Sequence, residues 1–137
     1  MKLKEIVTQA NKELNEALTQ AKFISKLFES RTQAHIYHLQ TTSYAAHKAL
    51  DDYYSSIVDL VDSLVEEQQG KTGIIKGYET NKFDEGTDYI SYFSNLRSMI
   101  NLNRYKTFKQ EDTNIQNTID EIVSLLDSTI YKLKFLK

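Results

Sequence analysis

Residues 34–67 read AHIYHLQTTSYAAHKALDDYYSSIVDLVDSLVEE. Three consecutive hydroxyl residues in this stretch, Thr41, Thr42 and Ser43, interrupt the apolar pattern and offer N-caps for a new helix. The apolar residues that follow recur mainly at steps of three and four, which is the period of an amphipathic helix. They are Ala46, Leu50, Tyr53, Ile57, Leu60, Val61 and Leu64. We therefore expect a helix over about residues 43–67, with another helix before it.

The residues before this stretch predict a helix with one apolar stripe. The stripe follows steps of three and four along Leu3, Val7, Ala10, Leu14, Ala17, Ala21, Ile24 and Phe28. The same steps continue to Arg31, His35 and His38, so the core-facing side becomes polar toward its end. Because a buried polar group is costly without a hydrogen-bond partner, these histidines need partners.

After the quoted stretch, residues 70–86 read GKTGIIKGYETNKFDEG and contain all four glycines of the chain, at 70, 73, 77 and 86. This composition predicts one long connection. A third helix is expected from about Asp88, with its inward face formed by Tyr89, Ile90, Phe93, Leu96 and Ile100. A short joint at residues 106–110 leads to a last helix capped by Glu111 or Asp112. Its apolar seam is Ile115, Ile119, Ile122, Leu126, Ile130 and Leu133.

The order of the joints is short, long and short. Short joints connect antiparallel neighbours, and one long joint crosses the bundle, which is the connectivity of ferritin-like proteins. We therefore predict a single all-α domain over residues 1–137, a ferritin-like four-helix bundle with one long crossover between the second and third helices. An up-down-up-down bundle with a loose middle loop is the alternative.

Composition limits the kind of protein. The 137 residues include no proline and no cysteine, which favours long helices and excludes thiolate metal sites and disulfides. No apolar run approaches the ~20 residues needed to cross a membrane, and the first residues lack the apolar core of a signal peptide. We expect a cytoplasmic protein without membrane contact. The net charge of −2 makes DNA binding doubtful, and the lysines at the two ends are interpreted as solvated.

Metal-ligating residue types gather on one face of the second predicted helix. A helical wheel places His47, Asp51, Tyr54, Val58, Asp62 and Val65 on one arc, with Glu66 at its edge. This arc borders the apolar arc and should be half-buried. Imidazole and carboxylate together suit iron, zinc or manganese. The acids Asp52, Asp59 and Glu67 are expected to point outward into solvent.

One copy of the chain cannot bring all these groups to one ion. Asp51 and Asp62 are eleven residues apart, or ~16 Å along a helix. Two copies packed antiparallel about an axis near residues 55–56 would place His47 and Asp51 beside the partner's Asp62 and the partner's Glu66, at two equal sites. Tyr54 and Val58 would then lie at the crossing. An ordinary di-iron bundle is excluded, because the chain has no Glu-x-x-His motif.

The spacing of these residues resembles the ferroxidase segment of the Dps miniferritins. That family has a histidine, a second one twelve residues on and an acid four further, then an aspartate fifteen after the second histidine and a glutamate four later. His35, His47, Asp51, Asp62 and Glu66 reproduce these intervals. Two departures are Ile36, where the family usually has tryptophan, and the lack of a long basic tail.

The resemblance implies a function and an assembly. It implies that Fe(II) is oxidised at a dinuclear site shared between two subunits, with all five residues as ligands, and that iron is stored in a shell of twelve subunits. Zinc or manganese are the other metals that this site could take. The role of His38, one turn from His35, stays open. The alternative is a non-catalytic structural or interaction protein on a ferritin-like scaffold.

Overall fold

The computed structural model describes residues 2–5 and 17–137, and its regular structure in those ranges is helical, with no strand. Its four long helices are α2 (Gln20–Gln40), α3 (Tyr44–Thr72), α4 (Tyr89–Thr107) and α5 (Thr113–Phe135), and residues 3–5 form one further helical turn. The expected all-α class is confirmed. The positions expected for Val7, Ala10 and Leu14 lie outside the described residues.

The helix starts are set by hydroxyl caps. The Ser43 side chain accepts a hydrogen bond from the backbone N–H of Ala46 at 3.2 Å, as the sequence predicted. Thr19 caps α2 in the same way, and residues 17–19 before it are not helical. The expected continuous first helix is therefore wrong, since the apolar stripe contained no signal for this break.

The end of α3 also differs from the expectation. The helix passes residue 67 and continues to Thr72, so that Gly70 is helical rather than part of the connection. Gly73 follows with a φ of 95° and a ψ of −177°, an extended conformation with positive φ that only glycine adopts at low cost, and the helix ends there. The joint between α4 and α5 covers residues 108–112, and Asp112 is the N-cap of α5.

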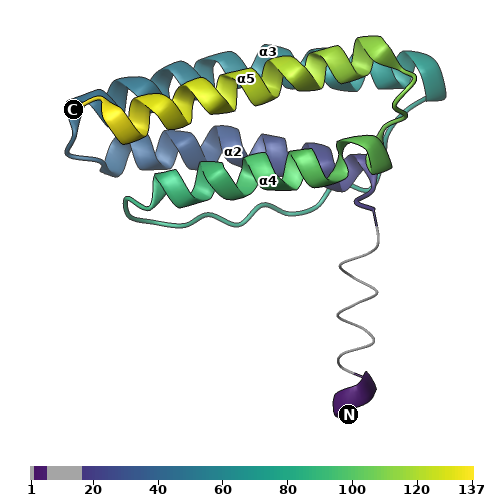
Figure 1. The fold of residues 1–137 in the computed structure, drawn as a ribbon, viewed down its shortest axis with the longest axis horizontal. Coiled ribbons are helices and arrows are strands. Elements are labelled where there is room, and N and C mark those ends of the chain that lie inside the picture. Colours follow the sequence, from purple (N-terminus) through teal and green to yellow (C-terminus); the bar gives the residue numbers. More distant parts are fainter. Residues whose placement is uncertain (1, 6–16) are drawn as a thin grey trace.

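The helices form a bundle in which the long connection runs back along its whole length (Figure 1). The pairs α2–α3 and α4–α5 are antiparallel, whereas α3 and α4 run in the same direction. Helix α2 packs against α3 and α4, and α5 packs against the same two helices. The largest fully buried side chains include Phe23, Ile24, Leu27, Leu50, Tyr53, Ile57, Leu64, Phe93, Ile100, Ile115 and Ile119.

Most of the inward positions expected on the last three helices are buried. The exceptions are Leu60, Tyr89, Ile90 and Ile130, which are only half-buried. On α2 the expectation fails at Phe28, whose side chain is 40% exposed. This residue lines a pocket on the surface between α2 and α3.

The crossover, residues 73–88, contains no helix or strand and is held by side chains of α2. The Gln33 side chain is 1% exposed; it donates to the Asp84 carbonyl at 2.8 Å and accepts from the Asp84 N–H at 2.7 Å. Ser25 accepts from the Glu79 N–H at 3.0 Å, and Gln40 accepts from the Gly86 N–H at 2.6 Å. These bonds satisfy backbone groups that neither a helix nor a strand satisfies.

Replacing Gln33 by leucine should loosen the crossover. The change leaves the Asp84 N–H and C=O without their partner, which should cost about 1–3 kcal/mol of unfolding free energy. Urea unfolding measures this loss, and limited proteolysis should show faster cleavage within residues 73–88. Gln40→Leu is the control, because water can replace its exposed bond to Gly86. Equal stability of the two variants would contradict a structural role for Gln33.

Candidate metal site

Three histidines and a tyrosine form a row of rings where the end of α2 meets the start of α3. His35 stacks on Tyr54 with ring centroids 4.3 Å apart and planes at 16°. His38 stacks on His47 with centroids 3.6 Å apart and planes at 20°. The two stacked pairs meet where Tyr54 and His38 contact edge to face, at 5.3 Å. The short joint at residues 41–43 makes this possible, because it folds α3 back beside α2.

Reciprocal hydrogen bonds fix the proton positions on two of these rings. Nδ1 of His38 lies 2.7 Å from the His47 carbonyl oxygen, and Nδ1 of His47 lies 2.9 Å from the His38 carbonyl oxygen. A carbonyl only accepts, so each Nδ1 carries a hydrogen, and the neutral form of either ring would have its lone pair on Nε2. An imidazole with its other nitrogen bonded to a backbone carbonyl is the arrangement usual for metal-ligating histidine.

A half-buried carboxylate completes this cluster. The Asp51 side chain accepts a hydrogen bond from the Tyr54 hydroxyl. This bond lowers the pKa of Asp51 below its ordinary value, and the charges of His38 and Lys48 lower it further. The same bond raises the pKa of the Tyr54 hydroxyl. Asp51 is therefore an anion beside the imidazoles, and Tyr54 keeps its proton.

The other two predicted ligands lie elsewhere on α3. Asp62 and Glu66 are both exposed, and neither makes a hydrogen bond or ion pair with another described residue. Among residues 2–5 and 17–137, no three histidine, aspartate or glutamate side chains are close enough to hold an ion. The structure thus places His35, His47 and Asp51 around two shared neighbours, Tyr54 and His38, but the three are not close enough to one another to hold an ion. One copy of the chain therefore does not present the five-residue set.

The acids expected to point into solvent differ from one another. Asp59 is exposed as expected, and the exposed Asp52 lies 3.6 Å from the ammonium of Lys132. For Glu67 the expectation is wrong, because its carboxylate faces α5 and accepts from the Thr118 hydroxyl at 2.6 Å. A helical wheel cannot show this contact, since it depends on which neighbour packs against that side of α3.

An apolar pocket of about 220 Å³ lies on the outer α2–α3 surface, between the histidine cluster and Asp62 along α3. Its lining residues are Leu27, Phe28, Arg31, Ile57, Val58 and Val61. Sequence reasoning placed Val58 at a contact between copies, but it assigned Phe28 to the core. The polar Arg31 at the end of the apolar stripe was the signal that this part of α2 faces outward.

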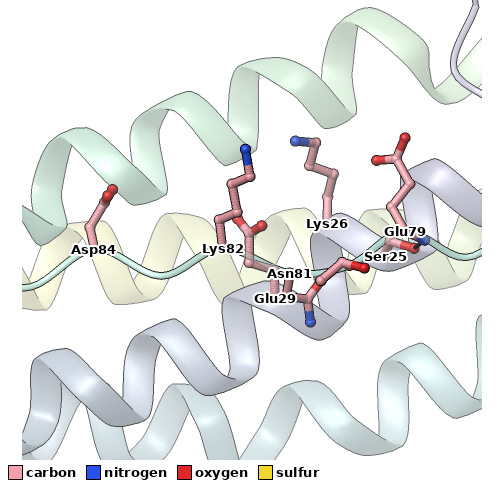
Figure 2. Close-up of a pocket in the computed structure, with 8 residues that line it drawn as sticks. Ser25, Lys26, Glu29, Glu79, Asn81, Lys82 and Asp84 are labelled. Carbon is pink, nitrogen blue, oxygen red and sulfur yellow. Dashed lines mark hydrogen bonds between the residues drawn. The ribbon is translucent and has the colours of Figure 1, made fainter.

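A larger pocket of about 400 Å³ lies between α2 and the crossover (Figure 2). The side chains of Lys26 and Lys82 extend in the same direction there, and Glu29, Glu79 and Asp84 also line it. It contains no histidine and none of the predicted site residues. Charges of both signs and the lack of a histidine give this pocket no preference for a metal or for one class of anion.

Comparison with known proteins corrects the expected relationship. Residues 38–133 match a family of unknown function, DUF5856. An uncharacterized 14.6 kDa protein from the mobD-ri intergenic region of Enterobacteria phage T4 is 29% identical over 114 residues, which cover 81% of this chain and 84% of that protein. No solved structure matches. None of the helices in the described ranges is long and apolar enough to span a membrane.

The resemblance to the Dps miniferritins is therefore wrong as a statement of family, because the matching family is a different one. Intervals of four, eleven and fifteen residues are close to whole numbers of helical turns. Polar residues on one helix face produce such intervals without common descent. The matched region contains α3, α4 and most of α5 and covers well over half of the chain, so this protein belongs to the DUF5856 family.

Proposed function

We propose that this protein is a homodimer that binds a first-row divalent metal, with iron(II) as its substrate, at two sites shared between the copies. Each site takes His35, His47 and Asp51 from one copy and the partner's Asp62 and the partner's Glu66 from the other. The observation that carries the proposal is that the first three side chains share two neighbours, Tyr54 and His38, and that the imidazole rings are held by hydrogen bonds and stacking.

The position of the remaining ligands supports a shared site. Asp62 lies eleven residues after Asp51 on α3, or ~16 Å along the helix, and is exposed without a partner among the described residues. A two-fold axis across α3 brings it beside the cluster of a second copy. The apolar pocket around Val58 lies between the two ligand groups, so the same contact would cover the exposed part of Phe28.

The helix arrangement supports an outer rather than an inner site. We propose that the bundle is ferritin-like, because the crossover makes α3 and α4 parallel. Bundles of that kind usually hold metal in the core, with ligands from facing helices. Here the interior is filled by apolar and aromatic side chains such as Leu50, Ile57 and Ile119. The candidate ligands lie on the outer α2–α3 side, where a second copy can reach them.

The donor set suits iron oxidation. Two Fe(II) ions each give one electron to hydrogen peroxide, which takes up two protons and becomes two water molecules. The three carboxylates of the proposed site favour Fe(III) over Fe(II), because negative charge stabilises the more highly charged ion. The lowered pKa of Asp51 keeps that ligand ionised. The protein supplies position and charge, and the electrons come from iron.

A structural or interaction role is the second candidate. Five large apolar side chains are exposed where α5 ends, at the same end of the bundle as the α2–α3 joint (Figure 1). They are Leu39, Tyr44, Tyr131, Phe135 and Leu136. Such a patch fits a protein contact and does not require a metal. If the protein bound no divalent metal at neutral pH, that result would favour this second role.

Iron oxidation should depend on the five proposed ligands. Alanine at His35, His47, Asp51, Asp62 or Glu66 should slow Fe(II) oxidation at least about tenfold, because each change removes a metal-binding group. The near-ultraviolet absorbance of the Fe(III) product measures the rate. Asp59→Ala is the matched control, since that exposed carboxylate lies on the same helix outside the site. Unchanged rates in all five variants would exclude the proposed site.

Dimerisation and metal binding should be lost together when Val58 becomes glutamate. The charge would lie in the apolar pocket at the proposed contact and would repel its copy in the partner. Native mass spectrometry measures both the subunit number and the bound metal, and circular dichroism checks that the helices persist. A helical monomer that keeps its metal would show that the site is not shared.

Mixed dimers test the sharing directly. His47→Ala and Asp62→Ala should each be nearly inactive, because either change damages both sites of a dimer. After joint unfolding and refolding, half of the dimers would contain one chain of each kind, and each would have one intact site. The mixture should therefore recover about a quarter of the wild-type activity. Mixed dimers that stay as inactive as their parents would contradict the intersubunit site.

A further inference from the structure

Each histidine ligand of the proposed site lies against a ring that is not a proposed ligand. His35 is stacked on Tyr54, and His47 is stacked on His38. Tyr54 and His38 also contact each other edge to face at 5.3 Å. The result is a group of four rings in the order His35, Tyr54, His38 and His47, which links α2 to α3, and His38 also contacts His35 edge to face at 5.8 Å. We call it the ring row.

The geometry of the ring row decides the role of His38. An imidazole nitrogen binds metal along its lone pair, which lies in the plane of the ring, at about 2 Å. The His38 and His47 rings are 3.6 Å apart with planes only 20° from parallel. No point near both rings lies in both planes, so the two Nε2 atoms cannot bind the same ion while the rings are stacked. His38 is therefore not a fellow ligand of His47 in this arrangement.

We propose that Tyr54 and His38 are the positioning residues of the metal site, each holding one ligand imidazole face to face. This inference rests on the proposed function, which identifies His35 and His47 as ligands. Tyr54 has a second task, because its hydroxyl also donates to the carboxylate of Asp51. His38 has a second task as well, because its Nδ1–H donates to the backbone carbonyl of His47.

The physical advantage of this arrangement is that the ligand side chains are ordered before the metal binds. His35 is exposed, and an exposed side chain otherwise samples several rotamers that binding would have to restrict. Stacking on Tyr54 restricts the ring, and the hydroxyl of the same tyrosine restricts Asp51. On the other pair, the reciprocal bonds occupy Nδ1 of His47 and so leave Nε2 as the nitrogen that can bind metal. A metal thus meets three of its ligands already oriented by two residues.

Paired substitutions separate the ring from its polar group. Tyr54→Phe and His38→Phe keep a ring to stack against, whereas Tyr54→Leu and His38→Leu remove it. Tyr44→Leu is the control, because that exposed tyrosine on α3 makes no hydrogen bond or ring contact with another described residue. The probe is Co(II), whose visible absorption reports the number and geometry of its ligands, added to the full-length dimer.

The two leucine variants should bind Co(II) about tenfold more weakly than wild type and with an altered visible band, yet reach the same number of ions per dimer. The phenylalanine variants should recover most of the affinity, and Tyr44→Leu should match wild type. His47→Ala should lower the number of bound ions. Thermal unfolding of each variant separates a local effect on the site from general loss of structure.

Three results would overturn the inference. One is wild-type affinity and spectrum in both leucine variants, which would show that the rings position nothing. The second is a reduced number of ions in His38→Phe, as in His47→Ala, which would make His38 a ligand. The third is wild-type protein that binds no Co(II), in which case the proposed function fails and this inference with it. The first two leave the proposed function standing, so the failures are distinguishable.

Discussion

The return of the chain along the bundle is the constraint on which the rest of the structure depends. An extended segment over residues 73–88 has backbone groups that no helix or strand satisfies, and the side chains of Ser25, Gln33 and Gln40 satisfy several of them. Because these three residues lie on α2, the crossover follows the side of α2 that is near α4 (Figure 1). The opposite side, between α2 and α3, is not covered by the crossover, and this is the side where we propose that a second copy binds.

Helix period and capping chemistry explain how much of the fold could be predicted from the sequence. Apolar steps of three and four gave the buried seams of α3 and α5, because those helices contact neighbours along most of their length. The same steps failed on α2 at Phe28, since part of that face is at the outer surface. The break at residues 17–19 was also missed, because Thr19 differs in no local feature from other hydroxyl residues in the chain.

The candidate site, too, could be predicted from the sequence only in part. The arc of His47, Asp51 and Tyr54 on α3 follows from helix geometry alone. The contact of His38 with His47 does not, because it depends on how three joint residues reverse the chain. Whether Glu67 faces solvent or a neighbouring helix depends on where α5 packs, and the sequence of α3 alone does not determine that. The agreement with the miniferritin spacing misled for a related reason: helical repeats constrain residue intervals in any family that places polar groups on one face.

The reciprocal bonds between His38 and His47 have a consequence for the order in which the chain folds. They join residues nine apart, whereas the bonds of Gln33 to Asp84 join residues fifty-one apart. Closing the longer loop costs about 1.5 kcal/mol more chain entropy than closing the shorter one. Contacts between near neighbours in sequence also form faster than distant ones. The α2–α3 hairpin can therefore assemble as a local unit, with its imidazoles already paired, before the crossover closes the bundle behind it.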